Sequence, residues 1–463
     1  MNAELVVQLC YLAASILFIL GLQGLGSPER ARRGVLLAEI GMVLAVAGTL
    51  LRHEVITYQW IIAGALIGAA VGTWISLKIP MTMMPERIAF SHAFGGLAVA
   101  LVGISEYWHL REIGEQMNTL QMTATGLEVL LGAVTFTGSL VAFGKLQGFL
   151  SGKPVTFKGQ NFFNLVLAVV AVALVLWLVF NPTAFAAFCV LACLALVIGV
   201  SLVMPIGGAD MPVVICLLNS YAGLAAAATG FSLRNNVLII CGALDGGSGF
   251  ILGMMMSKAM NRSFSNVLFG AFGSATTTTV AGELPGRAPN QASVEDAVEV
   301  LRAARTVIVV PGYGMAVSQA QHAVHELQAA LAAGGCTVKY AIHPVAGRMP
   351  GHMNVLLAEA NVAYDALFDL EQINDEFAAA DVALVVGAND VVNPAARTDP
   401  ASPIFGMPIL NADAARSCIV LKRSLNPGFA GIENGLFVSP NTMLVLGDAK
   451  KTITAFTQAI KSG

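Results

Sequence analysis

Charged side chains are scarce in this chain of 463 residues, of which only 11% are Asp, Glu, Lys or Arg. A soluble domain carries about 25% charged residues. The shortage affects the chain before about Arg262, and charged residues return to a near-normal density after about Glu283. The chain therefore joins an apolar half to a soluble half. Its formal net charge of −3 does not favour a nucleic-acid partner.

The seven cysteines form no CxxC pair and lie in apolar or strand-like runs. Such cysteines are typically small buried hydrophobic residues, not disulfide partners or metal ligands. We therefore expect no metal site. The N-terminus also lacks a basic segment and a small-residue cleavage site, so we interpret the first apolar run as a retained helix and not as a signal peptide.

Long apolar runs fill the first half of the chain. A run of about 20 apolar residues can cross the hydrocarbon core of a bilayer as a helix. The runs of this kind are Ala3–Gly24, Gly34–Leu51, Thr57–Leu77, Arg87–Tyr107, Thr123–Leu146, Phe162–Phe180, Ala184–Met204, Met211–Phe231 and Val237–Met256. We expect residues 1–262 to form a polytopic α-helical membrane bundle with about nine transmembrane helices.

The distribution of cations predicts the orientation of this bundle. With the N-terminus outside, the cations on the outer side are Arg52, Arg111 and Arg234. Those on the inner side are Arg30, Arg32, Arg33, Lys78, Arg87, Lys145, Lys153, Lys158, Lys258 and Arg262. Because inner loops carry the excess of Lys and Arg, this bias predicts a multi-pass protein whose C-terminal domain is cytoplasmic.

Gly64, Gly68 and Gly72 form a GxxxGxxxG stripe in the third apolar run. Small residues at this spacing let two helix backbones approach closely. We expect the stripe to pack within the bundle, and self-association of the protein is the alternative.

Polar residues inside membrane spans are costly, so each one is a candidate for a function. His92 can take and release a proton near neutral pH, and the sequence leaves open whether it relays protons or only bonds a neighbouring helix. Ser139, with Thr135 and Thr137, either lines a polar path or bonds its own helix carbonyls, the second being favoured. Asn219 is at least an interhelical hydrogen-bonding residue.

Four acidic residues complete the set of intramembrane candidates. Glu39, Glu128 and Asp245 lie within apolar runs. Asp210 precedes the eighth run at its cytoplasmic end, where a negative charge favours the positive end of the helix dipole.

The segment from Gly273 to Asn290 is rich in Gly, Pro and Thr and has no apolar periodicity. This composition is typical of a flexible linker. We therefore assign residues 263–290 as a linker between the membrane bundle and a domain at residues 291–463.

Strand and helix patterns alternate after Arg305. Alternation of this kind predicts a Rossmann-like, doubly wound, mostly parallel α/β sheet. One helix after the first strand is expected to bury Val317, Ala320, Val324, Leu327 and Leu331 and to end at Gly334-Gly335. The expected strands are Thr306–Val310, Thr337–Ile342, Ala366–Leu370, Val382–Val386, Cys418–Leu421 and Met443–Leu446.

A glycine turn follows the first of these strands. The residues Gly312 to Val317 read GYGMAV and approximate GxGxxG. Two glycines in such a turn let a phosphate approach a helix N-terminus. Because a strand precedes the motif and a helix follows it, we interpret the turn as part of a dinucleotide site.

The second strand lacks the acid that an NAD site places at its end for the ribose 2′-hydroxyl, since it ends in Ala341-Ile342-His343-Pro344. Lys422-Arg423-Ser424 follow a later strand. Two cations and a hydroxyl on one loop suit the 2′-phosphate of NADP. The alternative is a solvated basic turn.

The chain resembles the β subunit of proton-translocating nicotinamide nucleotide transhydrogenase over essentially its whole length. The segments that carry the resemblance are Gly207–Pro212, Gly312–Gln321, His343–Glu359 (HPVAGRMPGHMNVLLAE), Gly387–Pro394 (GANDVVNP) and Lys422–Asn426 (KRSLN). The resemblance implies transfer of hydride from NADH to NADP⁺ with inward movement of protons across the membrane.

The resemblance also implies roles for particular residues. It places His92, Ser139 and Asn219 on the proton path, and Asp210 and Asp390 in coupling. Asp245 stands at a position that is usually apolar in the family. The residues implied to contact NADP(H) are Gly312, Tyr313, Gly314, Met315, Ala316, Val317, Val345, Ala346, Gly347, Arg348, Met349, Pro350, Gly351, Gly387, Ala388, Asn389, Asp390, Lys422, Arg423, Ser424, Gly428, Phe429, Ala430, Asp448 and Ala449.

A single dinucleotide fold holds one nucleotide, whereas transhydrogenation needs two. We therefore expect NAD(H) to bind an α subunit, and the resemblance implies a dimer of α–β units in a bacterial inner membrane. An alternative of another class is an NADP(H)-sensing channel or transporter subunit without redox activity. A structural anchor for another dehydrogenase is a weaker alternative, because the polar residues in the spans argue against it.

Overall fold

The structure is a computed structural model that describes residues 3–51, 57–80, 83–152, 154–207, 210–260, 289–349, 351–402, 404–428 and 430–462. The chain divides into two compact units. One unit comprises Met1–Gly207 and Val214–Gly253, and the other comprises Gly208–Val213 and Met254–Gly463.

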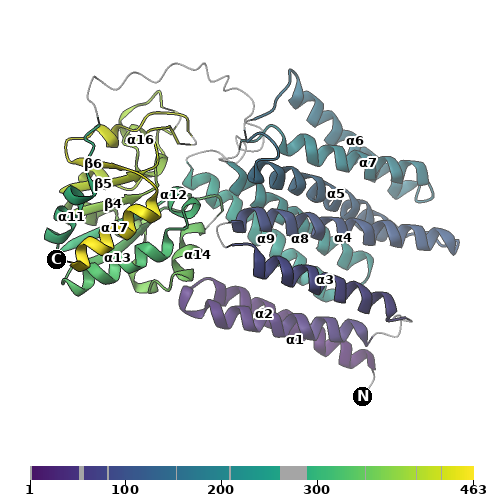
Figure 1. Ribbon diagram of the computed structural model, residues 1–463. Helices are drawn as coiled ribbons and strands as arrows, with labels where there is room; N and C mark the ends of the chain where they lie inside the picture. The colour runs from purple at the N-terminus through teal and green to yellow at the C-terminus, as the bar shows by residue number, and fades with distance from the viewer. Residues whose placement is uncertain are drawn as a thin grey trace. The chain divides into compact units, whose positions relative to one another are not determined.

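Long helices make up the first unit (Figure 1). They are α1 (Ala3–Leu25), α2 (Pro28–Leu50), α3 (Gln59–Lys78), α4 (Met84–Glu112), α5 (Thr119–Gln147), α6 (Gln160–Phe180), α7 (Phe185–Val203), α8 (Met211–Ser232) and α9 (Asn236–Ala259). Within the described residues, nine helices are long and apolar enough to cross a membrane. The expected helical membrane bundle is therefore confirmed.

Close backbone contact at glycines holds several of these helices together. A Cβ atom on Gly96 of α4 would lie 2.8 Å from the Gly132 carbonyl oxygen of α5. On Gly223 of α8 it would lie 2.2 Å from the backbone nitrogen of Gly246 of α9. These positions accept no side chain, so the two helix pairs approach more closely than any larger residue would permit.

The glycine stripe of α3 makes no such contact. A Cβ atom on Gly64, Gly68 or Gly72 would meet no atom within 4 Å in the described part of the chain, and α3 has no buried residue. The expectation that the stripe packs within the bundle is therefore wrong for this chain by itself. Self-association through the stripe stays a prediction.

A six-stranded parallel sheet is the centre of the second unit, with strand order β3-β2-β1-β4-β5-β6. This is the doubly wound order of Rossmann-like folds, as predicted. The strands are β1 (Thr306–Pro311), β2 (Thr337–Ile342), β3 (Leu367–Asp369), β4 (Val382–Val386), β5 (Ser417–Lys422) and β6 (Thr442–Leu446). Each lies within one residue of the predicted range at both ends, because these strands are continuous apolar runs bounded by polar turns.

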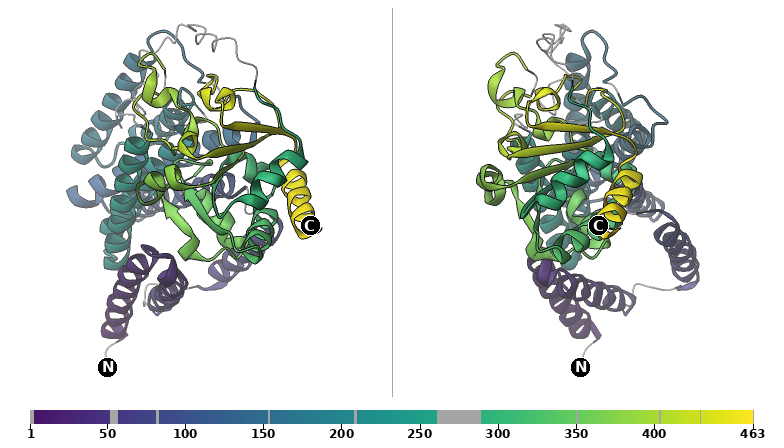
Figure 2. Two further views of the ribbon diagram at one scale, coloured as in Figure 1. Left: turned by 90° about the vertical axis from the view of Figure 1, so that its left-hand side faces the viewer. Right: turned by 60° about the vertical axis from the view of Figure 1, so that its left-hand side comes forward.

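Different elements cover the two faces of this sheet (Figure 2). The helices α11 (Val294–Ala303), α13 (Gln321–Ala333) and α17 (Ala449–Ser462) pack together on one face. On the other face, the short helices η4 (Asn374–Ala379), η6 (Ala412–Ala414) and η7 (Gly435–Val438) bury Phe377, Ala412 and Leu436 against the strands. The loops that carry the candidate site connect these elements.

The segment after β1 differs from the predicted single helix. It forms α12 (Tyr313–Val317) and α13 (Gln321–Ala333), separated at Gln319, whose φ is +51°. Val317 is 47% exposed and does not belong to the buried stripe that contains Leu327 and Leu331. The predicted end of the second helix is observed, since Gly335 adopts φ +84° as a left-handed C-terminal residue.

Most of the predicted linker, residues 263–288, lies outside the described residues. The chain after it pairs with the edge of the sheet. The Asn290 carbonyl accepts from the Leu444 amide at 2.8 Å, and Gln291 bridges to Leu444.

Candidate functional site

The central strands β1 and β4 lie side by side where the strand order reverses, which is the place where doubly wound sheets bind ligands. Their following turns are bonded to each other. The amides of Gly312 and Gly314 donate to the carbonyls of Val386 and Gly387, each at 2.9 Å. A Cβ atom on Gly387 would lie 2.4 Å from the Gly314 Cα atom, and Gly387 also adopts φ +68°.

The two glycines of the GYG motif therefore serve first to bring two backbones together. We expected them to let a phosphate approach a helix N-terminus. In this structure their amides hold the β1 turn against the β4 turn, and the helix that follows has only five residues. A ligand at this edge is thus positioned by a rigid double turn more than by a helix dipole.

A cavity opens at this edge of the sheet. Its lining includes glycines and small residues from the turns after β1, β2, β4 and β5. Among the predicted contact residues, the lining contains Gly312, Tyr313, Gly314, Val317, Val345, Ala346, Gly347, Gly387, Ala388, Asn389, Asp390, Lys422, Arg423, Ser424, Gly428, Ala430 and Ala449. Residues that are distant in sequence are thus brought together around one space.

Other predicted contact residues do not line the cavity. Met315 and Ala316 are fully buried beneath the turn. Asp448 caps α17, because its Oδ1 atom accepts from the Lys451 amide at 3.1 Å. Arg348, Met349 and Gly351 also lie outside the lining, and Pro350 and Phe429 lie outside the described residues.

Two buried histidines shape the loop after β2. The Val345 amide donates to His343 Nδ1 at 3.2 Å, so Nε2 carries the proton and donates to the Pro408 carbonyl at 2.7 Å. His352 Nδ1 likewise accepts from the Arg348 amide at 3.1 Å. Burial lowers the pKa of each histidine to about 4, so both are neutral near pH 7 and act as loop supports.

The same loop reaches the β1 turn through a stacked pair. The guanidinium carbon of Arg348 lies 4.5 Å from the centre of the Tyr313 ring. Such cation–π contacts are typical of Arg over an aromatic face. No acid follows β2, because the strand ends at Ile342 and the buried His343 comes next.

The turn after β4 is linked to the segment Gly428–Ala430, which we call the lid. Asp390 Oδ2 accepts from the Ala430 amide at 3.0 Å. In the amide orientation that satisfies its neighbours, the Asn389 side-chain oxygen accepts from the Gly428 amide at 2.7 Å and from Lys422 Nζ at 3.2 Å. A Cβ atom on Gly428 would lie 2.5 Å from Asp390 Oδ1, so only glycine allows this contact.

The predicted basic loop begins at the end of β5. Lys422 Nζ donates to the Asn426 carbonyl at 2.9 Å and lies 4.5 Å from the centre of the Phe437 ring. Burial lowers the pKa of Lys422, and the neighbouring Asp390 opposes that shift. Arg423 and Ser424 are exposed at the cavity. Lys422 thus belongs to the lid network, while Arg423 and Ser424 are accessible to a ligand.

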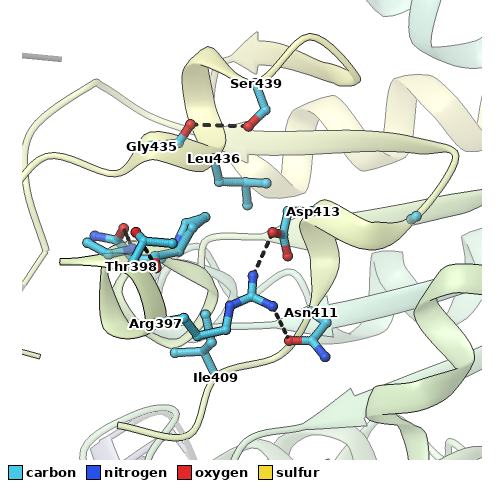
Figure 3. Close-up of polar contacts among 12 residues, drawn as sticks. Arg397, Thr398, Ile409, Asn411, Asp413, Gly435, Leu436 and Ser439 are labelled. Carbon is cyan, nitrogen blue, oxygen red and sulfur yellow. Dashed lines mark hydrogen bonds and ion pairs between the residues drawn. The ribbon is translucent and has the colours of Figure 1, made fainter. Parts of the chain in front are cut away.

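Apolar residues on one side of the cavity were not predicted. Ile404 and Met407 come from the loop after α16 (Ala395–Thr398). This loop has no periodic pattern, so its place beside the cavity follows only from the fold. Arg397 fixes it, donating to Asp413 Oδ2 at 2.5 Å and Asn411 Oδ1 at 2.8 Å (Figure 3). Further unpredicted lining residues are Ser318, Val391, Leu421, Asn426, Pro427 and Gly447.

The membrane unit brings together two of the predicted proton-path residues. His92 Nε2 of α4 lies 2.5 Å from Asn219 Oδ1 of α8. Thr135 donates to the Leu131 carbonyl of its own helix, as favoured above, whereas Thr137 donates to the Leu196 carbonyl of α7 at 2.8 Å as well as to the Ala133 carbonyl of its own helix at 3.2 Å. Ser139 is 1% exposed and its hydroxyl has no hydrogen-bond partner among the described residues, so it differs from the two threonines.

Two further charged residues lie at the ends of membrane helices. Asp210 directly precedes α8, which begins at Met211. Lys145 caps the C-terminal end of α7, since its ammonium donates to the carbonyls of Met204 at 2.5 Å and Ile206 at 2.7 Å. Within the described residues, no group of three or more His, Cys, Asp or Glu side chains has the arrangement of a metal site.

Known proteins are similar to this chain over almost its whole length. The family model described as NAD(P) transhydrogenase beta subunit matches residues 7–459. A curated relative from Rhodospirillum rubrum, named NAD(P) transhydrogenase subunit beta, is 50% identical over 455 residues, covering 97% of this chain and 98% of its own. The protein of the same name from a designated strain of that organism has the same identity and coverage.

Proposed function

Since this chain belongs to the NAD(P) transhydrogenase beta-subunit family, we propose that it is the NADP(H)-binding and proton-translocating subunit of a membrane transhydrogenase. The family name implies transhydrogenase activity, use of nicotinamide nucleotides and an α-subunit partner. In the proposed organisation, residues 1–262 translocate protons, residues 263–290 connect the domains and residues 291–463 bind NADP(H).

One observation carries the choice of nucleotide. The cavity lies at the β1/β4 edge and is lined by Arg423 and Ser424, while β2 is followed by a buried neutral histidine in place of an acid. An acid at the end of β2 would favour the 2′-hydroxyl of NAD, and a cation with a hydroxyl favours the 2′-phosphate of NADP. The site residues therefore fit NADP(H) better than NAD(H).

The fit extends to the rest of the cavity. The double glycine turn at Gly312–Gly314 and Gly387 holds two backbones in contact at the strand ends beside the cavity, because a Cβ atom on any of these three glycines would lie within 2.7 Å of the opposite turn. The lid segment Gly428–Ala430 can cover a bound nucleotide, because its backbone bonds to Asn389 and Asp390 on the opposite turn. When bound, NADP⁺ supplies the nicotinamide that accepts hydride from NADH on the α subunit.

This chain contributes positioning and not a covalent catalyst. Tyr313 and Arg348 stack beside the cavity, and Gly428 and Ala430 line it. Holding two reactants in one geometry removes much of the entropy cost of their reaction. We assign no nucleophile or general acid for the hydride step.

Coupling to the membrane is assigned to two polar groups. The Asp390 carboxylate holds the Ala430 amide of the lid, so a change in its protonation alters lid closure. His92, bonded to Asn219 in the bundle, takes and releases the translocated proton, with Ser139 and Asp210 as further members of the path. If the nucleotide state biases the protonation of His92, protonation must bias nucleotide binding equally.

The proposed setting is a bacterial inner membrane, with the nucleotide domain in the cytoplasm and with two α–β units assembled as a dimer. The cation bias of the inner loops supports this orientation. Protons then move inward as hydride passes from NADH to NADP⁺.

The activity is tested with the full chain and its α subunit reconstituted in vesicles. NADH and an NADP⁺ analogue are supplied on the side of the nucleotide domain, and hydride exchange and internal pH are recorded together. Hydride exchange with coupled proton movement supports the proposal. Nucleotide binding and ion flux without hydride exchange would instead identify an NADP(H)-sensing channel.

The cofactor assignment has its own test. Arg423→Ala should weaken NADP(H) binding by roughly 10- to 100-fold, because a hydrogen bond to a charged group contributes about 1.5–3 kcal/mol, and should leave NAD(H) binding within about twofold. Equal losses for both nucleotides in calorimetric titration would contradict the 2′-phosphate assignment.

A further inference from the structure

The membrane unit joins His92 and Asn219 to a third polar side chain, Asp245 of α9. Asn219 Nδ2 donates to Asp245 Oδ1 at 3.0 Å, while Asn219 Oδ1 faces His92 Nε2 at 2.5 Å. The three side chains thus come from α4, α8 and α9, the helices labelled in Figure 1. The proposed function uses His92 and Asn219 but gives Asp245 no role.

Glycine contacts between α8 and α9 support this row. A Cβ atom on Gly249 would lie 3.0 Å from Asn219 Nδ2, and one on Gly223 would lie 2.2 Å from the Gly246 nitrogen. Ser220 Oγ also donates to the Gly246 carbonyl at 2.8 Å. The two helices are therefore held close enough for the Asn219 amide to reach the Asp245 carboxylate.

The donors and acceptors of the row define its charge. His92 Nδ1 lies 3.0 Å from the Ile88 carbonyl oxygen, which only accepts, so Nδ1 carries a hydrogen. Nε2 faces the Asn219 oxygen, which also only accepts, so Nε2 carries a second one. In this arrangement His92 is an imidazolium, and the amide nitrogen of Asn219 donates to an ionised Asp245.

Turning the Asn219 amide by half a turn gives a second arrangement, in which each of these polar atoms again has a hydrogen-bond partner. The amide nitrogen then donates to Nε2 of a neutral His92, and a protonated Asp245 donates to the amide oxygen. The two arrangements contain the same atoms, and one proton has moved from His92 Nε2 to the Asp245 carboxyl. His92 and Asp245 together carry no net charge in either arrangement, which suits a membrane interior where an isolated charge is costly.

Asp245 is exposed within this chain. Among the described residues, the polar atoms bonded to the Asp245 carboxylate come from Asn219, so His92 at the far side of that amide is its nearest cationic counterpart in the row.

We propose that Asp245 is a second proton-holding group of the membrane unit. The orientation of the Asn219 amide then depends on which of Asp245 and His92 holds the proton. This inference rests on the proposed function and deepens it. Release from Asp245 and uptake at His92 can then occur at different times, with the amide turning between them.

The test uses Asp245→Asn in the full chain, assembled with its α subunit in vesicles. Proton uptake per hydride transferred is measured as a function of pH. Loss of the carboxylate should move the pH of half-maximal uptake lower, by up to about one unit, because the protonated imidazole loses the negative charge on the far side of the Asn219 amide. Above that midpoint, uptake should fall by up to about tenfold.

Two further variants make the result specific. Glu39→Gln removes an exposed acid from α2 and should leave the midpoint unchanged. Asp245→Glu keeps the carboxyl group and should restore most of the uptake. In infrared difference spectra between two pH values, wild type should show a carboxylic C=O band that is absent from Asp245→Asn and displaced in Asp245→Glu.

An unchanged midpoint in Asp245→Asn, an equal shift in Glu39→Gln, or an infrared band unaffected by both Asp245 variants overturns the inference. The infrared comparison with Asp245→Glu serves the same purpose if Asp245→Asn does not assemble. Failure of the proposed function is separate, since it appears in wild type as hydride exchange without proton movement, or in His92→Ala as undiminished proton uptake.

Discussion

The membrane bundle and the sheet domain both bury polar side chains, but they bond them to different partners. In the bundle, Thr125 Oγ1 meets Ser232 Oγ at 3.0 Å, and Asn219 lies between two other side chains. In the sheet domain, Asn393 Nδ2 donates to the Glu433 carbonyl at 3.0 Å, and His343 donates to the Pro408 carbonyl. In these examples the bundle pairs side chains from different helices, whereas the sheet domain bonds side chains to loop backbone.

The difference follows from where backbone groups lack partners. A membrane helix satisfies its own backbone hydrogen bonds, so a buried polar side chain bonds another side chain or shares a helix carbonyl that already accepts, as Ser220 and Thr135 do. Loops at the ends of a sheet leave carbonyls and amides without a ladder partner, and each needs a bond when buried. Lys145 is a different case, because it bonds the carbonyls at the end of α7, which the helix itself leaves unpaired.

The largest expected effect concerns pH and the sheet domain. The pKa of His343 and of His352 is about 4 in the folded protein, below the value of about 6.5 in the unfolded chain. Their stabilisation is complete above pH 6.5 and decreases as the pH falls toward 4, because protonation then favours unfolding. Between pH 7 and pH 5 the loss is about 2 kcal/mol for each histidine.

Hydrogen–deuterium exchange of the purified full-length protein measures this loss. Protection of the amides in β1, β2 and the loop after β2 should decrease from pH 7 to pH 5, after correction for intrinsic exchange rates. His322→Gln removes an exposed histidine and should leave the pH dependence unchanged. Constant protection of these segments across this range would contradict the role of the two histidines as neutral loop supports.

The next effect tests the loop bonds of the sheet domain directly. Asn393 is fully buried; its Nδ2 atom donates to the Glu433 carbonyl, and its Oδ1 atom accepts from the Ala395 amide at 3.1 Å. Asn393→Ala removes both hydrogen bonds to the loop backbone, so it should cost roughly 1–3 kcal/mol at about 0.5–1.5 kcal/mol for each bond. Thermal unfolding of the full-length protein in detergent measures the loss.

A matched variant separates the two bonds. Asn393→Asp keeps an acceptor for the Ala395 amide but removes the donor to the Glu433 carbonyl. Its unfolding temperature should lie below that of wild type and above that of Asn393→Ala. If Asn393→Ala melts like wild type, the loop bonds contribute little and the contrast between the two units disappears.

The sequence predicts the elements of both units better than it predicts these bonds. The strands from β1 to β6 and the spans of the bundle were predictable, since apolar runs of fixed length specify strands or membrane helices by local chemistry alone. The dinucleotide turn was also predictable, because Gly312 and Gly314 lie between a strand and a helix. No local pattern connects Asn393 with Glu433 or His343 with Pro408.

The errors have identifiable physical causes. The break at Gln319 was missed because a non-glycine residue adopts positive φ there, so the helical periodicity of the following residues was extended too far back. The stripe at Gly64, Gly68 and Gly72 was assigned to packing within the bundle, yet isolated glycines such as Gly96 and Gly223 make the close contacts. Helix contact depends on the rotation of both partners, and a single sequence specifies neither.

A smaller effect is expected at the surface of the sheet domain. Arg397 bonds Asp413 and Asn411 in Figure 3, but the Arg397 side chain is 42% exposed. Because exposed ion pairs contribute about 0.2–1 kcal/mol, Arg397→Ala should lower the unfolding temperature only slightly. Arg397→Lys keeps the charge but not the forked geometry, so its unfolding temperature should lie between those of wild type and Arg397→Ala. A loss as large as that of Asn393→Ala would show that burial of the side chain does not determine how much these bonds contribute to stability.

The smallest effect is expected within the bundle. Thr125→Val removes one hydroxyl of the buried Thr125–Ser232 pair and preserves the shape of the side chain. Because interhelical hydrogen bonds in membranes average about 0.6 kcal/mol, and the Ser232 hydroxyl can turn to its own helix carbonyls, the loss should be near that value. Unfolding in mixed detergent measures it, with Thr123→Val as the control, since Thr123 bonds only the Thr119 carbonyl of its own helix. A loss of several kcal/mol for Thr125→Val would mean that side-chain pairs in the bundle are as costly to break as loop bonds in the sheet domain.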